Sequence, residues 1–140
     1  MLGRVMTIVW VLIAIAIAIV GLGYIRLAPS DPTQWHVTPQ GDVDRDLKFG
    51  VVRVVATGPG GLGQFDAIAS ASVRTTVLAG SVGEGMVTYV TRSKMMGFPD
   101  YTTAQQDGDT LRIFGRLRFG RSDLGVNKQR VERWLGQMQL

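Results

Sequence analysis

The N-terminal segment constrains this chain more than any other part of its sequence. Residues 5–25 contain no charged side chain and consist mainly of isoleucine, valine, leucine and alanine. A helix of this length rises about 31 Å, which is enough to cross the hydrocarbon core of a bilayer. Trp10 and Tyr24 lie toward its two ends, where amphipathic aromatic rings favour the membrane interface. We therefore expect residues 1–27 to form a transmembrane anchor that contacts the lipid bilayer through residues 5–25.

The alternative for this segment is a cleaved signal peptide. The apolar core of a signal peptide usually spans about 7–15 residues, and this core is longer. The sequence that follows, G-Y-I-R-L-A-P at residues 23–29, contains no clean small-x-small cleavage site. An uncleaved anchor is therefore favoured. The short tail before it suits a single-pass protein of a bacterial inner membrane with its C-terminal domain in the periplasm.

The cysteine and histidine content excludes several kinds of site. The chain has no cysteine and a single histidine, His36. Disulfides, thiolate catalysis and histidine-rich metal sites are therefore excluded within one chain. Asp42, Asp44 and Asp46 imitate the start of a calcium loop, but the glycine and glutamate required further along such a loop are absent. We expect a solvated acidic turn there, and no metal or cofactor.

Three prolines mark the segment that follows the anchor. Pro29, Pro32 and Pro39 restrict φ and remove backbone donors, which predicts an extended linker without helix over residues 28–48. Trp35 is too large to be left exposed without a reason. We expect it to lie either on the domain or at the membrane surface.

Residues 49–140 have the pattern of a small α+β domain. β-branched and alternating stretches predict five strands, and apolar residues at helical spacing predict two helices. The pair Asp107-Gly108 between two alternating segments is a strong hairpin signal, because type I′ turns require positive φ. The expected fold is an antiparallel sheet covered on one face by both helices. The strands are expected at residues 49–56, 74–79, 86–94, 101–106 and 109–119, and the helices at residues 64–73 and 127–138.

A glycine-rich loop at residues 58–63 imitates a dinucleotide-binding fingerprint. It reads G-x-G-x-x-G and lies between a predicted strand and a predicted helix. The residues after it predict consecutive hairpin strands, whereas the dinucleotide-binding fold alternates strands and helices. We interpret the loop as a flexible strand-to-helix connection.

The positive charge of the chain is concentrated near its C-terminus. Residues 110–140 carry seven basic and two acidic side chains, whereas residues 31–109 carry six basic and nine acidic ones. Alternation places Arg112, Arg116 and Arg118 on one face of the last predicted strand, where Arg92 and Lys94 can join them. Such a basic surface suits anionic lipid, an acidic partner or nucleic acid, and the alternative, which the composition favours, is a solvated surface that keeps the domain soluble. We expect anionic lipid or a membrane-protein partner, and no nucleic acid.

The loop and helix after this strand supply further candidate residues. Ser122, Asp123 and Asn127 suit an anion or partner site, but turn and helix-cap chemistry explains them as well. The candidate anion- or partner-binding site comprises Arg116, Arg118, Arg121, Ser122, Asp123, Asn127 and Arg130.

These C-terminal residues also carry a resemblance to a known family. The sequence G-R-S-D-L-G-V-N-K-Q-R-V-E at residues 120–132 resembles the closing signature of the domain-of-unknown-function 1499 family. The F-P-D at residues 98–100 is similar to that family's upstream turn. The D-P-T-Q-W-H at residues 31–36 is similar to the linker of its alphaproteobacterial, single-anchor branch.

The resemblance covers residues 31–138 and departs from the family pattern in two places. Many members have serine where this chain has Leu117, and an aromatic residue where it has Arg121. The resemblance implies a small domain, often exported or membrane-tethered in bacteria, with no established activity.

Three functions are compatible with these observations. The first is a membrane-anchored accessory or binding protein of the cell envelope, with the basic C-terminal surface as its contact. The second is a domain that binds an anionic ligand or a lipid headgroup, since the arginine fork suits phosphate and carboxylate. The third is a hydrolase that uses Asp123 or Asp100, which we rank last because His36 lies in a linker and no spacing pairs two carboxylates. We therefore expect a protein that is not an enzyme.

Overall fold

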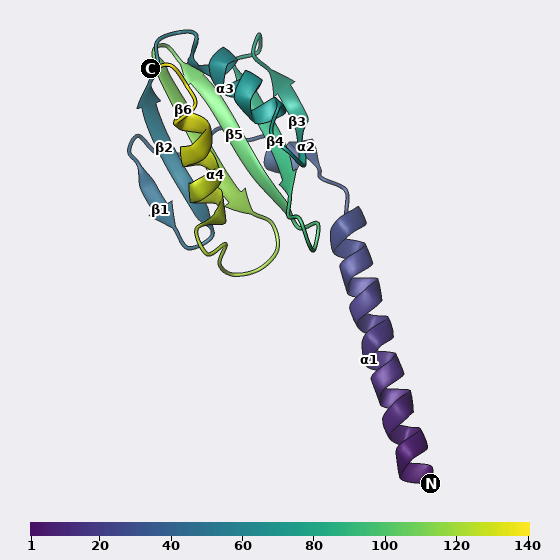
Figure 1. The fold of residues 1–140 in the computed structure, drawn as a ribbon. Helices are drawn as coiled ribbons and strands as arrows, with labels where there is room; N and C mark the ends of the chain where they lie inside the picture. The colour runs from purple at the N-terminus through teal and green to yellow at the C-terminus, as the bar shows by residue number, and fades with distance from the viewer.

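A six-stranded antiparallel sheet carries the domain, with two helices on one face and the anchor helix projecting from one end (Figure 1). The computed structural model describes residues 1–140. The strands run in the order β1-β2-β6-β5-β4-β3 across the sheet. The elements in chain order are α1 (Leu2–Leu27), α2 (Pro32–Trp35), β1 (Arg45–Leu47), β2 (Gly50–Ala56), α3 (Gly61–Ser70), β3 (Thr75–Ser81), β4 (Met86–Arg92), β5 (Pro99–Asp107), β6 (Thr110–Leu117) and α4 (Val126–Leu135).

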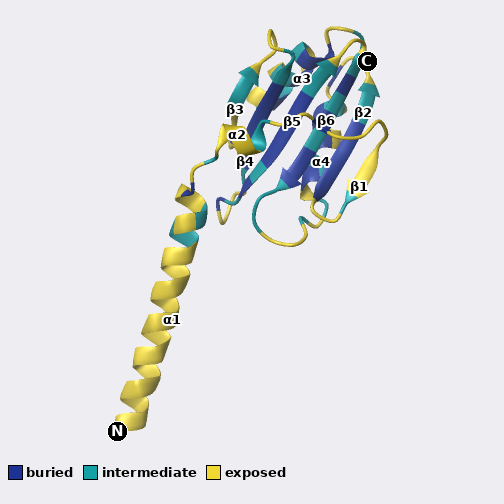
Figure 2. Ribbon diagram, turned by 180° about the vertical axis from the view of Figure 1, so that it is seen from behind, coloured by how far each residue is buried: buried dark blue, intermediate teal, exposed yellow.

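Helix α1 stands apart from the domain along almost its whole length. None of its residues is buried, and Figure 2 shows it exposed while the central strands of the sheet are buried. Its most apolar window has a mean hydropathy of 2.9, so the helix is long and apolar enough to cross a membrane. A core helix of a soluble protein would bury an apolar face against its own domain, and α1 does not.

The core lies between the sheet and helices α3 and α4, as the α+β prediction requires. Leu111 and Ile113 point from β6 toward the helices and are fully buried. At the centre, the rings of Phe65 and Trp134 lie 5.6 Å apart, and that of Tyr89 lies 6.2 Å from Trp134. Strands β5 and β6 form the predicted hairpin, but Asp107 pairs with Thr110, so the two turn residues are Gly108 and Asp109. Only Gly108 has a positive φ, of 56°, whereas a type I′ turn requires two.

The segment predicted as an extended linker over residues 28–48 contains both a helical turn and a strand, so that prediction was wrong in part. Helix α2 begins at Pro32, which fits the first helical position, and the Asp31 carboxylate accepts from the Thr33 N–H at 2.9 Å. Strand β1 lies in the acidic stretch that was expected to be a solvated turn. It pairs with β2, and its Asp46 binds Arg53 at 2.8 Å.

The linker packs against the sheet face that lies opposite α3 and α4. The Trp35 ring stacks on Tyr101 at 4.0 Å with an interplanar angle of 13°. Ser30 hydrogen-bonds the Tyr101 hydroxyl at 2.7 Å, and the His36 ring nitrogen lies 2.9 Å from the Thr88 hydroxyl oxygen. Trp35 therefore docks on the domain, which is the first of the two expected placements.

Candidate anion-binding site

The sheet separates the residues that the sequence grouped into one candidate site. Antiparallel pairing places Arg116 opposite Tyr101, on the linker face of the sheet. Arg130 lies on α4, which covers the other face. Arg121 and Ser122 are exposed in the β6–α4 loop. The seven predicted residues therefore do not form a single site.

On the linker face, Arg116 and Arg118 hold the linker in place. Arg116 is only 5% exposed, and its guanidinium donates to the Trp35 carbonyl and to the Thr103 hydroxyl. Burial lowers the pKa of Arg116 to about 10, which still leaves it cationic at neutral pH. Arg118 donates to the Pro29 carbonyl at 2.9 Å. Both arginines therefore have structural partners and are not free for a ligand.

In the β6–α4 loop, Ser122 and Asp123 shape the entry into α4. The Asp123 carboxylate accepts from the N–H groups of Gly125 and Asn127 at 3.0 and 3.1 Å. The Ser122 hydroxyl accepts from the Leu124 N–H at 3.3 Å. The turn-and-cap explanation therefore accounts for both residues.

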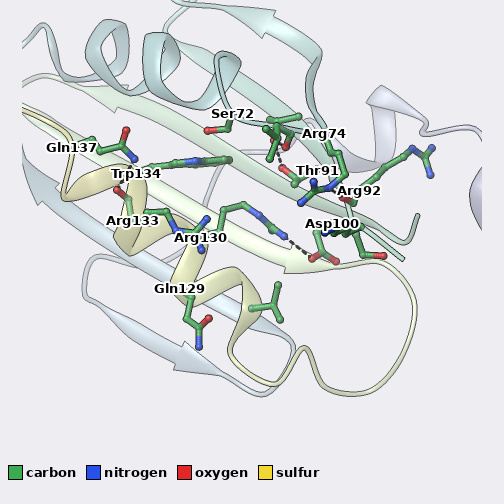
Figure 3. Close-up of a pocket in the computed structure, with 15 residues that line it drawn as sticks. Ser72, Arg74, Thr91, Arg92, Asp100, Gln129, Arg130, Arg133, Trp134 and Gln137 are labelled. Carbon is green, nitrogen blue, oxygen red and sulfur yellow. Dashed lines mark hydrogen bonds and ion pairs between the residues drawn. The ribbon is translucent and has the colours of Figure 1, made fainter. Parts of the chain in front are cut away.

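Of these seven residues, Arg130 alone lines the pocket beside α4, together with Arg92, Lys94 and Asp100, which the sequence analysis named separately. Arg130 Nη2 lies 3.3 Å from Asp100 Oδ2 (Figure 3). Its Nη1 donates to Asn127 Oδ1 at 2.7 Å. The Arg130 and Asp100 side chains are only 12% and 15% exposed. Burial raises the pKa of Asp100 above its usual value, and the nearby Arg130 charge opposes that rise.

This pocket lies beside α4, the α3–β3 connection and the adjoining ends of β3 and β4 (Figure 3). It has a volume of about 350 Å³ and is lined by 15 residues, of which only Val73, Val126 and Trp134 are hydrophobic. A lining this polar suits a small charged group better than an apolar ligand. The basic residues of the lining are Arg74, Arg92, Lys94, Arg130 and Arg133, and its single carboxylate is that of Asp100.

Most of the positive charge in this pocket has no carboxylate partner. Of the five basic residues, only Arg130 belongs to an ion pair. The guanidinium of Arg74 donates to the Arg92 carbonyl at 3.1 Å, and that of Arg92 donates to the Gly97 carbonyl at 2.9 Å. Lys94 and Arg133 make no ion pair. The pocket therefore carries an excess of positive charge that an anion can neutralise.

Arg74 and Arg133 were not among the candidate residues of the sequence analysis. Arg74 has a φ of 54°, a left-handed conformation that costs a non-glycine residue about 1–2 kcal/mol. Nothing in the local sequence predicts that conformation. Arg133 was detectable, because residues three apart on a helix lie on the same side and Arg130 was already a candidate.

No set of three or more histidine, cysteine, aspartate or glutamate side chains is arranged to hold a metal ion. The pocket therefore offers donors for an anion and no ligand set for a cation.

No curated protein and no solved structure matches the chain. A family model described as "Protein of unknown function (DUF1499)" matches residues 28–138. The match begins directly after the anchor helix and includes the linker, in keeping with the packing of that linker on the sheet. The chain therefore belongs to the DUF1499 family.

Proposed function

We propose that this protein is a membrane-anchored binding protein that holds an anionic group, a phosphate or a carboxylate, in the pocket beside α4. The observation that carries the proposal is the set of basic residues around one pocket with a single carboxylate. Guanidinium groups suit such ligands because their planar fork makes two parallel hydrogen bonds to phosphate or carboxylate oxygens.

The membrane location is part of this proposal. Helix α1 has the length and hydropathy of a membrane span. We place α1 in a bacterial inner membrane as an uncleaved signal anchor and the domain in the periplasm. The anionic group would then belong to an envelope molecule or to an acidic segment of a membrane-protein partner.

Binding explains the site better than catalysis does. Both Asp123 oxygens accept backbone hydrogen bonds, and Asp100 is paired with Arg130. The only histidine, His36, lies on the opposite face of the sheet beside Thr88. A hydrolase in this pocket would therefore lack a free general base. We propose a non-catalytic role on this ground.

The first prediction concerns Arg133, which lines this pocket and is exposed. In full-length protein solubilised in zwitterionic detergent, we expect Arg133→Gln to weaken sulfate binding about tenfold, since a charge-assisted hydrogen bond contributes about 1.5–3 kcal/mol. Isothermal titration calorimetry measures the affinity. Arg133→Glu should weaken it further, because the new charge repels the anion.

The matched control is Arg45→Gln. Arg45 is an exposed arginine on β1, at the opposite edge of the sheet from β3. Its substitution should leave the sulfate affinity within about twofold of the original, because distant surface charges are screened. Equal weakening by Arg45→Gln and Arg133→Gln would show general charge attraction and would contradict a pocket. A wild-type protein without saturable sulfate binding would contradict it as well.

The second prediction concerns the pH dependence of the same affinity. The pKa of Asp100 lies above its ordinary value of 3.8, mainly through burial, with Arg130 opposing and Asp123 adding to the rise. As the pH falls from about 7 toward this pKa, Asp100 gains a proton, its negative charge disappears and Arg130 is released. Sulfate remains a dianion over this range, so its affinity should rise as the pH falls.

Asp100→Asn tests this cause. The variant should bind sulfate more tightly than the original at neutral pH, and its affinity should vary less with pH. Asp109→Asn is the control, since Asp109 is exposed and lies between β5 and β6. An unchanged pH profile in Asp100→Asn would show that another group controls the affinity.

A further inference from the structure

The end of the domain that faces α1 differs from the rest of its surface. The loops after β4 and after β6 lie at the same end of the sheet as the last turn of α1 (Figure 1). The rings of Tyr24 and Phe119 lie 6.4 Å apart. The Arg26 side chain lies against Gly97 of the β4–β5 loop, so closely that a Cβ added to Gly97 would be 2.9 Å from Arg26 Nε. If Tyr24 and Arg26 lie at the membrane interface, both loops lie at the level of the lipid headgroups.

The junction between α1 and the domain is short. Ala28 follows α1 directly, is buried, and donates its N–H to the Tyr24 carbonyl at 2.7 Å. The next residues pack at once on the sheet, where Ser30 hydrogen-bonds the Tyr101 hydroxyl. The chain therefore has little slack, and this end of the domain remains close to the end of the membrane helix.

A second pocket lies at this junction. It has a volume of about 370 Å³ and is distinct from the pocket beside α4, although four residues line both. Arg26 comes from α1 itself and lines only this second pocket, whereas Arg133 lines only the first. Its lining contains no carboxylate, and none of its basic residues belongs to an ion pair. The lining consists of Arg26, Arg74, Thr76, Val90, Arg92, Ser93, Lys94 and Gly97.

Apolar side chains in the β4–β5 and β6–α4 loops are exposed at this end of the domain. Met95 is 84% exposed in the β4–β5 loop, and Leu124 is 87% exposed in the β6–α4 loop. Met96, next to Met95, is 40% exposed. Lys94 and Arg121 provide positive charge in the same loops. Exposed apolar tips among basic residues are typical of surfaces that enter the headgroup region of an anionic bilayer.

We propose that this end of the domain docks on the bilayer, with the second pocket holding the phosphate of an anionic phospholipid headgroup. The Arg26, Arg92 and Lys94 side chains supply the donors, and Thr76 and Ser93 supply hydroxyl groups. Met95 and Leu124 enter the interface on either side. The proposal rests on α1 spanning the membrane and does not require a ligand in the pocket beside α4.

The absence of cysteine makes this proposal directly testable with a single label. Full-length protein carrying Met95→Cys is labelled with the fluorophore NBD and reconstituted into vesicles of phosphatidylcholine with about 30% phosphatidylglycerol. We expect lipids spin-labelled at the headgroup to quench this label about threefold more than a label on Asp109→Cys, between β5 and β6. Equal quenching at the two positions would overturn the docking.

Charge variants then test the pocket. Arg26→Gln with Lys94→Gln should reduce the quenching at position 95 about twofold, as should vesicles of pure phosphatidylcholine. Arg133→Gln should leave it unchanged, so a failure of sulfate binding beside α4 and a failure of docking are distinguishable. Circular dichroism verifies that each variant is folded. Unchanged quenching in the Arg26 and Lys94 double variant would overturn the headgroup site.

Inorganic phosphate separates the lipid from a free ion. Phosphate added to protein in pure phosphatidylcholine vesicles should not reproduce the quenching that phosphatidylglycerol causes. If it does so to the same extent, free phosphate in the pocket is enough to bring position 95 to the bilayer, and the assignment of the pocket to a phospholipid headgroup is wrong.

Discussion

Trp134→Ala is expected to lower the free energy of unfolding by about 3–5 kcal/mol, the largest effect of any substitution considered for this protein. Trp134 is 2% exposed, and its ring packs edge-to-face on Phe65 at 5.6 Å and on Tyr89 at 6.2 Å. The substitution removes the ring that joins α4 to α3 and to β4. Because Trp134 also lines the pocket beside α4, we expect sulfate affinity to fall with stability.

Trp10→Ala is the matched control for this prediction. Trp10 lies on α1 and is exposed, so the same chemical change removes no contact within the domain. Calorimetric unfolding of the full-length protein in detergent should show a change within about 0.5 kcal/mol for Trp10→Ala. A loss below about 1 kcal/mol for Trp134→Ala would show that the interior lacks the tight packing on which the fold depends.

Arg116→Ala is expected to lower the free energy of unfolding by about 3 kcal/mol and to release the linker from the sheet. Arg116 is buried and joins Trp35 to Thr103 and to the Phe114 carbonyl. Its guanidinium carbon also lies 4.7 Å from the centre of the Phe114 ring. Removal leaves the Trp35 carbonyl with only the long, 3.4 Å hydrogen bond from the Thr103 hydroxyl and opens a gap beside the indole.

Arg116→Met separates charge from packing. Methionine retains most of the aliphatic volume and removes a buried charge that has no carboxylate partner, so its loss should be smaller than that of alanine. Limited proteolysis follows the linker directly, with faster cleavage at residues 28–40 expected for Arg116→Ala. Arg121→Ala, which alters an exposed arginine, should change neither readout. Linker cleavage at the original rate in Arg116→Ala would show that stacking on Tyr101 alone holds Trp35.

The two pockets give the basic residues at the end of β4 a common role. Arg92 and Lys94 line both the pocket beside α4 and the pocket at the α1 junction. A ligand in one pocket therefore changes the electrostatic potential of the other. Two anions that share these residues would compete where they come close, because like charges in one site repel.

The helices and strands were largely predictable because their signals are local. The uncharged run at residues 5–25 predicted α1, and the Asp107-Gly108 pair predicted the β5–β6 hairpin. Helix α3 begins at Gly61 instead of residue 64, and α4 ends at Leu135 instead of residue 138. Such shifts at helix ends are common, because the last turn depends on capping and packing.

Helix α2 and strand β1 were missed for different reasons. Helix α2 depends on the Asp31 cap and on Pro32 at the first helical position, a local signal that three nearby prolines obscured. Strand β1 is a short edge strand that pairs with the adjacent β2, and its Asp46 forms ion pairs with Arg53 on β2 and with Lys128 on α4. Lys128 lies far away in sequence, and no local pattern contains that contact.

By itself, the sequence determined that this protein has an apolar membrane-length helix followed by a small antiparallel sheet with two helices. Periodicity and turn chemistry act over a few residues and are visible in one dimension. Only the tertiary structure decided which basic residues meet. Alternation along β6 placed Arg116 on the sheet face that the linker covers. Helix α4, which covers the opposite face of the sheet, carries Arg130 and Arg133. The sheet order then brought Arg74 and Arg92 to the same pocket, because side chains far apart in sequence converge only when strands pair and helices pack.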